Sequence, residues 1–265
     1  MADNLPRAAI NFNDALGGGN LIDRNLLWNI CRESGDHGPI NSWNRMPFLH
    51  DLGPDGRPSF TPLPTEIVNN YIIANFGGSQ GVDNDDGSSH FHTHDNVFYM
   101  SDGFKMDYGG HDSSFHDNLI VNYPYDGQRC LNLGGGFEAG HGDAFYNNTC
   151  VVGIGGTRKP SGCGDPSCFP ACAGLDPFRS SCGLSHAPAV GLDHVGTLGS
   201  CDPSRIKSSG NRYFSPNGNA TVDCSGHPYS IADAQALFKV ELGSTAGPLP
   251  TDDEIVGWAK EKLGL

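Results

Sequence analysis

Basic residues are scarce in this 265-residue chain, which has 16 lysines and arginines against 30 acidic residues and a formal net charge of −14 at pH 7. No Lys/Arg-rich run occurs, which excludes the usual electrostatic footprint of a nucleic-acid-binding protein. An anionic polymer would also be repelled unless a cation or a local basic site intervenes. Long apolar runs are absent too, so we expect no membrane span, and the first residues do not have the pattern of a secretory signal peptide.

Paired C-x-x-C motifs of the zinc-binding kind are also missing, although the chain has nine cysteines. Six of them lie between residues 163 and 224: Cys163, Cys168, Cys172, Cys182, Cys201 and Cys224. We interpret residues 160–205 as an insertion closed by disulfides, which indicates an extracellular or secretory-pathway location. Because no signal peptide accompanies these cysteines, we expect the chain to be part of a longer secreted protein.

A short phrase recurs along the chain, in which polar residues are followed by an asparagine and then by an alternating apolar run. The asparagine of this phrase is found at Asn25, Asn70, Asn96, Asn118 and Asn148. The intervals from the second of these onward are 26, 22 and 30 residues, which favours a solenoid of short strands. Asparagine suits such a position because it tolerates left-handed backbone at a tight corner and because stacked asparagines can hydrogen-bond to one another.

This repeat resembles the right-handed parallel β-helix of the pectin-lyase-like family, which comprises extracellular proteins that act on polysaccharides. The resemblance covers about residues 8–225 and implies an all-β fold, a right-handed parallel β-helix solenoid with C-terminal capping helices. An unrelated β-sandwich with glycine-rich turns is the alternative. The alternating run at 7–14 looks like a solenoid strand with no capping helix before it. We therefore expect upstream coils of a longer protein, or a partner, to cover this end.

We expect residues 1–265 to form a single domain. Residues 46–65 are rich in proline, which excludes regular structure and indicates a loop that stands out of the solenoid. Residues 229–265 contain two helix-start signals of the capping-box kind and are interpreted as a C-terminal helical cap.

Charged residues on two neighbouring expected strands would form a row on one outer face: Asp83, Asp85, Lys105 and Asp107. Carboxylates on adjacent coils would lie about 5 Å apart when stacked directly and about 7–8 Å apart on a diagonal. These separations suit retaining and inverting glycoside hydrolysis respectively, and like charges so close drive the two pKa values apart. We predict that the three aspartates act as acid, base or nucleophile, and that Lys105 and His37 assist them.

Other interpretations of this row stay open. Its carboxylates could be solvated or hydrogen-bonded ladder residues without chemistry. Residues 83–86 could also bind calcium through their carboxylates, which makes calcium the one cofactor to consider. The family resemblance adds that lyases of this fold often combine calcium with a lysine or arginine base, for which Lys105 and Arg129 are the candidates.

Histidines form a second signal, because His90, His92 and His94 alternate and would share one face of a strand. Three alternating histidines can bind zinc, but we expect a hydrogen-bonded histidine ladder and assign no metal ligand. The predicted substrate-binding side chains are aromatic, charged or imidazole groups around the row: Asp36, Trp43, Arg45, Tyr108, His111, Arg129, Glu138 and His141.

The family resemblance therefore implies a secreted carbohydrate-active protein, a glycoside hydrolase or lyase that acts on a polysaccharide or oligosaccharide, and the charged row would supply its carboxylate acid/base chemistry. The alternative is a non-catalytic extracellular protein that binds carbohydrate or serves in surface adhesion. The chain does not match the full catalytic motif of any single β-helix enzyme family, so the sugar, the linkage and the reaction type are left open.

Overall fold

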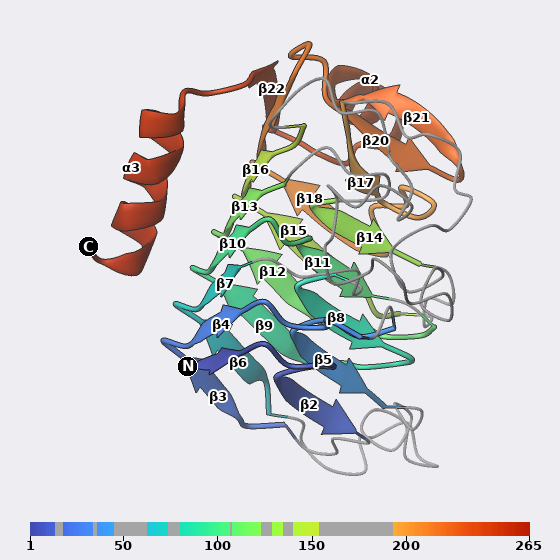
Figure 1. Ribbon diagram of the computed structural model, residues 1–265. Coiled ribbons are helices and arrows are strands. Elements are labelled where there is room, and N and C mark those ends of the chain that lie inside the picture. The colour runs from blue at the N-terminus through green and yellow to red at the C-terminus, as the bar shows by residue number, and fades with distance from the viewer. Residues whose placement is uncertain are drawn as a thin grey trace, which may run out of the picture.

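The computed structural model of the protein describes residues 1–13, 18–33, 36–44, 63–73, 80–106, 108–122, 129–134, 140–153 and 193–265, and all statements below concern these ranges. Within them the chain is mostly β-structure, arranged in three sheets, with two α-helices. Figure 1 shows the strands as stacked short arrows that run from the blue amino-terminal strands at one end of the molecule to the orange carboxy-terminal strands at the other.

The three sheets are named here by their strands. Sheet A contains β1 (Ala2–Asp3), β4 (Leu26–Trp28), β7 (Tyr71–Ile73), β10 (Val97–Tyr99), β13 (Leu119–Val121), β16 (Thr149–Val151), β19 (Arg212–Ser215) and β22 (Thr245–Pro248). Sheet B contains β2 (Ile10–Asn13), β5 (Ile40–Trp43), β8 (Val82–Asp85), β11 (Phe104–Met106), β14 (Leu131–Leu133), β17 (His194–Thr197), β20 (Thr221–Cys224) and β21 (His227–Ser230). Sheet C contains β3 (Leu21–Asp23), β6 (Thr65–Val68), β9 (Phe91–His94), β12 (Ser114–His116), β15 (Asp143–Tyr146) and β18 (Ile206–Ser209).

Up to β20 consecutive strands belong to different sheets, so the chain visits sheets B, C and A in turn, and β21 then stays in sheet B beside β20. Each strand from β1 to β17, and β19, pairs in parallel with the strand three places further along, whereas β20 and β21 pair antiparallel. The predicted stacking in sheet B is confirmed, because Ile40 pairs with Val82, Val82 with Phe104 and Phe104 with Leu131. One recurrence of the asparagine phrase therefore corresponds to one passage through the three sheets.

The core is the space enclosed by the three sheets, and it is filled by the inward half of each alternating strand. Phe98, Phe104, Phe115 and Phe145 are fully buried, and the rings of Phe115 and Phe145 stack at 5.6 Å between centroids. Burying each such side chain stabilises the fold by roughly 1.5–3 kcal/mol. Successive rounds place similar residues above one another, because parallel pairing in register stacks them at about the strand spacing.

The predicted asparagine ladder is confirmed and is longer than expected, because Asn211 extends it. At each step the backbone N–H and the side-chain amide of one asparagine donate to Oδ1 of the next, with donor–acceptor distances of 2.8–3.2 Å. The ladder asparagines are not themselves left-handed. The residue before each one has positive φ instead: Arg24, Asn69, Asp95, Asp117, Asn147 and Gly210. The corner thus turns at the preceding residue and leaves the asparagine free to point inward.

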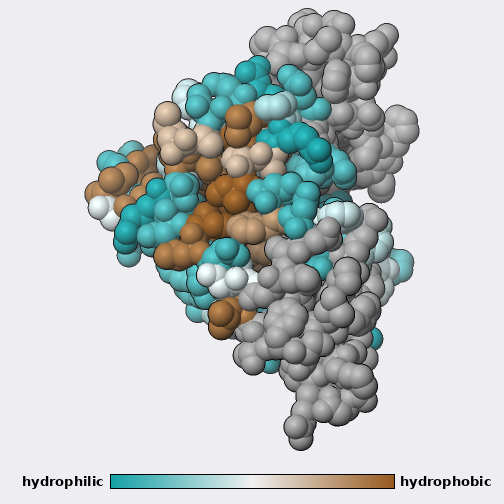
Figure 2. Space-filling model, turned by 90° about the horizontal axis from the view of Figure 1, so that it is seen from below, coloured by the Kyte–Doolittle hydropathy of each residue, from teal (hydrophilic) through white to brown (hydrophobic). Residues whose placement is uncertain are grey.

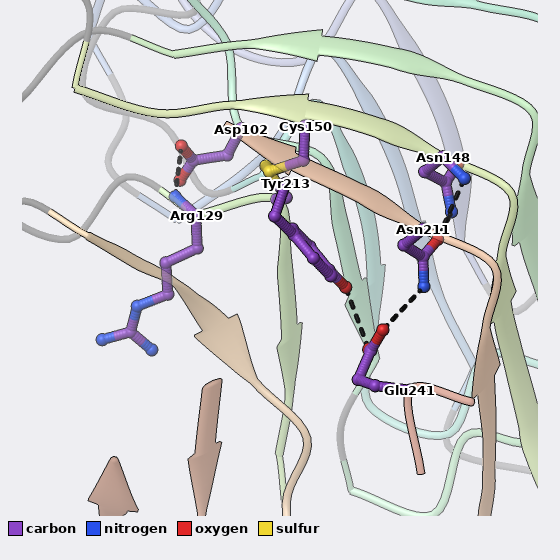
Figure 3. The surroundings of a disulfide bond; sticks show 8 residues. Asp102, Arg129, Asn148, Cys150, Asn211, Tyr213 and Glu241 are labelled. Atoms are coloured by element: carbon purple, nitrogen blue, oxygen red, sulfur yellow. Dashed lines mark hydrogen bonds between the residues drawn. A yellow bond between two sulfur atoms is a disulfide. The ribbon is translucent and has the colours of Figure 1, made fainter. Parts of the chain in front are cut away.

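The ladder ends on a buried carboxylate, as Figure 3 shows. Asn211 donates to Glu241 Oε2 at 3.1 Å, and Tyr213 donates its hydroxyl hydrogen to Glu241 Oε1 at 2.9 Å. Ser244 donates to Glu241 Oε2 at 2.6 Å, and Ser208 also donates to this carboxylate. Four donors satisfy a carboxylate that is 0% exposed, which anchors the segment after α2 (Ile231–Phe238) to the last round of strands.

The two predicted helix starts are confirmed, since Ser230 caps α2 and Thr251 forms a capping box with Glu254 at the start of α3 (Asp252–Leu263). The positions of the helices correct the expectation of a two-helix cap. Only α2 packs at the end of the stack, on β20 and β21, whereas α3 lies along the outer face of sheet A, against β10 and β13. Ile255 and Trp258 supply the apolar side of α3, which explains this placement.

At the opposite end of the stack, β1, β2 and β3 are the outermost strands of their sheets within the described residues. Figure 2 views the molecule from this side and shows apolar side chains gathered between polar ones. Leu21 and Leu63 are 68% and 57% exposed, and Ile10 and Phe12 are only partly buried. The expectation that further chain or a partner covers this end stays a prediction.

Two cysteine pairs lie at disulfide distance. Cys130 and Cys150 join sheet B to sheet A with Cα atoms 6.1 Å apart, and Cys201 and Cys224 are 5.2 Å apart. Cysteines 163, 168, 172 and 182 of the predicted insertion lie outside the described residues, as does most of the proline-rich loop at 46–65. Neither described helix is long and apolar enough to cross a membrane.

Candidate functional site

The outer face of sheet B carries a continuous polar row, one residue per strand. Pairing in register aligns these outward side chains: Asn11, Asn41, Asp83, Lys105, Asn132, Thr197 and Asp223. This set is called the outer row below. The sequence analysis placed its middle correctly, because alternation assigned the apolar neighbours Val82, Phe104 and Met106 to the core, where they are buried.

The centre of the outer row is an ion cluster of three side chains, called the Asp83–Lys105–Asp85 cluster. Lys105 Nζ lies 2.9 Å from Asp83 Oδ1 and 2.8 Å from Asp85 Oδ1. The side chain of Asp83 is 0% exposed, that of Lys105 is 14% exposed and that of Asp85 is 24% exposed. The prediction that Asp83 faces solvent is therefore wrong, because this carboxylate is buried beneath the ammonium. Asp85 is the acidic member that reaches the surface.

The local chain path explains why Asp83 is buried. Gly38 passes so close that a Cβ atom at its position would lie 2.1 Å from the carbonyl oxygen of Gln80 and 3.0 Å from Cβ of Asp83. The thiol of Cys31 is also buried near this carboxylate, and burial together with the charge of Asp83 raises the pKa of Cys31 to about 12. Cys31 is thus a protonated, unreactive thiol at neutral pH.

His37 lies beside the cluster, as the sequence analysis predicted. Its Nε2 lies 2.5 Å from a guanidinium nitrogen of Arg7. A guanidinium can only donate, so this imidazole nitrogen must accept and carries no proton. Burial and the charge of Arg7 lower the pKa of His37, while Asp36 and Asp85 act in the opposite direction. The site therefore contains a neutral imidazole close enough to Asp85 to interact with its charge.

Trp43 on strand β5 is paired in register with Asp85 on strand β8. Its indole N–H donates to Asp86 Oδ2 at 2.8 Å, which fixes the ring beside the cluster. The predicted substrate-binding role of Trp43 stays a prediction, and the structure places its ring beside the carboxylates of Asp85 and Asp86. Tyr108 is 71% exposed and is also accessible.

Arg129 lies further along the outer row. Its guanidinium donates to Asn132 Oδ1 at 3.1 Å and to Thr197 Oγ1 at 3.3 Å, and Figure 3 shows the side chain extending away from Asp102. The backbone N–H of Arg129 donates to Asp102 Oδ1 at 2.9 Å. Burial nevertheless raises the pKa of Asp102 to about 8, against the lowering effect of that hydrogen bond and of the Arg129 charge.

Sequence reasoning missed His194 and Asp223 at the far end of the outer row. His194 Nδ1 lies 3.9 Å from Asp223 Oδ1, and burial lowers the pKa of His194 to about 4 although Asp223 acts to raise it. The imidazole is therefore neutral at physiological pH. The prediction took residues 160–205 as an insertion, whereas His194–Thr197 form strand β17 of sheet B, so their side chains were not aligned with the outer row.

The predicted sharing of one face by His90, His92 and His94 is wrong. His90 has φ near 61° and lies at a corner before β9, whereas His92 and His94 point outward from sheet C toward Glu66. The predicted substrate contacts His111 and His141 lie with His90 at the corner between sheets B and C. His111 is only 2% exposed, so it is not available to a polymer.

Three predicted site residues, Asp107, Arg45 and Glu138, lie outside the described residues. The predicted stacking of Asp107 on Asp85 therefore stays a prediction. The calcium interpretation of residues 83–86 has no support in the geometry. Asn84 points into the core, where it accepts a hydrogen bond from Ser42 at 3.0 Å, and Lys105 already lies between the two carboxylates that would have to share a cation.

Comparison with known proteins does not assign the chain to a family. No family model, no curated protein and no solved structure matches it. The chemistry of the site must therefore be argued from its own side chains.

The described residues on and around the outer face of sheet B combine a surface carboxylate, an ammonium, a guanidinium and a neutral imidazole, which are those of Asp85, Lys105, Arg129 and His37. Such a set can accept hydrogen bonds from hydroxyl groups, neutralise a negative charge and move a proton. The burial of Asp83 and the hydrogen bonds of Arg129 hold these groups in place without large side-chain rearrangement.

Proposed function

We propose that this chain is a right-handed parallel β-helix of the pectin-lyase-like type, and that it is a secreted glycoside hydrolase whose polysaccharide substrate lies across the outer face of sheet B. The three parallel sheets, the chain's passage through them in turn and the asparagine ladder support the fold. The two cysteine pairs at disulfide distance support an oxidising, extracellular location.

The observation that carries the proposed activity is the Asp83–Lys105–Asp85 cluster. Lys105 lies within hydrogen-bond distance of both carboxylates and forms an ion pair with each of them. Only Asp85 combines this environment with contact to solvent. We therefore assign Asp85 as the carboxylate that activates water or attacks the sugar, and Asp83 as the buried partner that positions Lys105.

A hydrolase also needs a proton donor for the leaving oxygen. His37 is neutral, and its Nε2 accepts a hydrogen bond from Arg7, so we do not assign it as the proton donor. Asp107, which the sequence places one residue beyond β11, stays the candidate for the acid. Trp43 and Arg129 would contact the sugar at either side of the cluster, by stacking and by hydrogen bonding respectively.

Hydrolysis fits the cluster better than elimination. A lyase base must be able to lose its proton before it abstracts another from the sugar. Lys105 is stabilised as an ammonium by two carboxylates, and a guanidinium such as that of Arg129 stays protonated in proteins. Neither predicted lyase base is therefore in a suitable environment.

A non-catalytic carbohydrate-binding protein is the second candidate. One observation favours this candidate specifically. The side chain of Asp83 is 0% exposed, and Lys105 neutralises both its carboxylate and that of Asp85. A structural ion pair would have this form, and the remaining polar groups of the outer row would then serve only to hydrogen-bond sugar hydroxyls.

A panel of neutral and acidic polysaccharides separates these functions. The purified chain is incubated with each polymer while new reducing ends and the ultraviolet absorbance of unsaturated products are recorded, with and without calcium. Reducing ends without absorbance support the hydrolase. Absorbance that accompanies the reducing ends contradicts it and indicates a lyase. Retention on a polymer without any product, by protein shown to be folded, supports the binding function instead.

A further inference from the structure

Three successive corners between sheets B and C each place a histidine at the same point of the fold. His90, His111 and His141 follow β8, β11 and β14 respectively. The backbone aligns the first two, because Ser89 pairs with His111 and the N–H of His90 donates to the carbonyl of His111 at 3.2 Å. The ring centroids of His90 and His111 are 5.7 Å apart, and those of His111 and His141 are 4.4 Å apart.

One carboxylate completes this group. Asp112 Oδ2 lies 3.0 Å from His111 Nδ1 and 2.6 Å from His141 Nδ1. One ligand atom each from His90, His111 and Asp112 lies within 4.8 Å of the others. Four side chains of types that metal ions prefer therefore converge from three rounds of the chain, although the three histidines are far apart in sequence and have no metal-binding spacing.

We propose that His90, His111, Asp112 and His141 form a site for a divalent transition metal ion, with zinc as the preferred ion. Imidazole nitrogen with one carboxylate oxygen is a donor set that zinc accepts in tetrahedral geometry, whereas calcium and magnesium require mostly oxygen. Nothing in this inference depends on the proposed hydrolase, because the corner is distinct from the Asp83–Lys105–Asp85 cluster.

The geometry requires only small shifts to accept the ion. With bonds of about 2.0–2.1 Å, the ligand atoms of a tetrahedral zinc site lie roughly 3.3 Å apart. The ligand atoms of His90, His111 and Asp112 lie within 4.8 Å of one another, so side-chain shifts of about an ångström would bring them to bonding distance of one ion. Without metal, Nδ1–H of His111 and of His141 donates to Asp112 Oδ2, because a carboxylate can only accept. Coordination of an ion through Nδ1 would require the tautomer in which the proton is on Nε2.

The surrounding backbone keeps the corner tight. A Cβ atom at Gly110 would lie 1.9 Å from the Met106 sulfur and 2.7 Å from the carbonyl oxygen of Ser88, so only glycine fits there. His111 is 2% exposed, whereas Asp112 and His141 have side-chain exposures of 35% and 24%. A site with this limited access and four protein ligands suits a structural ion that joins three rounds of the solenoid.

Two substitutions test the site with little risk to folding. His90 and Asp112 both have positive φ, near 61° and 54°, and asparagine tolerates this conformation. His90→Asn and Asp112→Asn therefore remove one ligand each while retaining the backbone. His92→Asn is the matched control, because His92 lies outside the cluster and contacts Glu66 instead.

The experiment is zinc titration of the chelator-treated full chain by calorimetry, together with thermal unfolding. We expect one tightly bound ion, and a rise in the unfolding midpoint of about 5–10 °C at a free zinc concentration about 100-fold above the dissociation constant. His90→Asn and Asp112→Asn should each weaken binding at least tenfold, and His92→Asn should bind as the parent does. Absence of zinc binding, or binding that both ligand variants retain, would overturn the proposal.

Discussion

Asn118 offers the sharpest test of what stabilises the fold. Its side chain is 1% exposed and makes four hydrogen bonds. The amide donates to the carbonyl of Thr93 at 3.0 Å and to Asn148 Oδ1 at 3.1 Å. Its Oδ1 accepts from the backbone N–H and from the side-chain amide of Asn96, both at 3.0 Å. Asn118→Ala removes all four and leaves the Asn96 backbone N–H buried without its acceptor.

The magnitude follows from these contacts. Four buried hydrogen bonds at about 1 kcal/mol each, one of which satisfies the Asn96 N–H, predict a loss of about 3–5 kcal/mol in the free energy of unfolding. For a chain of this size each kilocalorie lowers the midpoint by roughly 2–4 °C, so thermal unfolding should begin about 10 °C lower. Denaturant unfolding followed by circular dichroism measures the free energy directly.

Two comparison variants make this prediction specific. Asn25 stands at the first step of the ladder and is only partly buried, so Asn25→Ala should lose about 1–2 kcal/mol. Asn118→Asp retains the acceptor but sets a carboxylate against two oxygens, so it should be least stable at neutral pH and recover as the pH falls. A loss at Asn118→Ala no larger than that at Asn25→Ala would refute the ladder as the main polar support of the fold.

Two further predictions concern the surroundings of the outer row. Burial raises the folded-state pKa of Asp102 to about 8, so the contribution of this group to stability is complete below about pH 4 and is lost as the pH rises through 8, with a slope of at most about 1.4 kcal/mol per pH unit. Asp102→Asn should flatten this part of the profile of unfolding free energy against pH, measured by denaturant unfolding. An unchanged profile would contradict the burial of that carboxylate. Gly38→Ala should destabilise the fold by about 1–3 kcal/mol because the added Cβ would meet the Gln80 carbonyl. Gly257→Ala on α3 is the control and should be neutral or stabilising, because a Cβ there meets nothing within 4 Å. Equal effects at the two glycines would contradict the close approach of Gly38 to the Gln80 carbonyl.

The stacking of strands was predictable because it follows from a short sequence repeat. The asparagine phrase and the alternation of apolar residues recur at short intervals, and pairing in register follows once the rounds are aligned. Asn211 was not predicted to belong to the asparagine ladder because 63 residues separate it from Asn148, and the predicted cysteine-rich insertion lies within that interval. A period cannot be followed through a segment that does not share it.

The details of the site depend on contacts between distant residues, which no local pattern encodes. Asp83 alternates outward as predicted, yet the approach of Gly38 and the pairing with Lys105 bury it. His90 precedes its strand in left-handed backbone, so its side chain does not follow the alternation of His92 and His94. The position of α3 was missed for a similar reason, since its apolar side fits either the end or the flank of a stack.

The most direct test of the central claim is the turnover number of Asp85→Asn on the polysaccharide that the parent chain cleaves. Asparagine retains the shape of the side chain but cannot act as a base or nucleophile, so we expect a loss of roughly hundredfold or more with the fold intact. Asp253→Asn, at an exposed position on α3, is the matched control and should retain parental activity. Parental activity in Asp85→Asn would contradict the assignment of the Asp83–Lys105–Asp85 cluster as the catalytic centre.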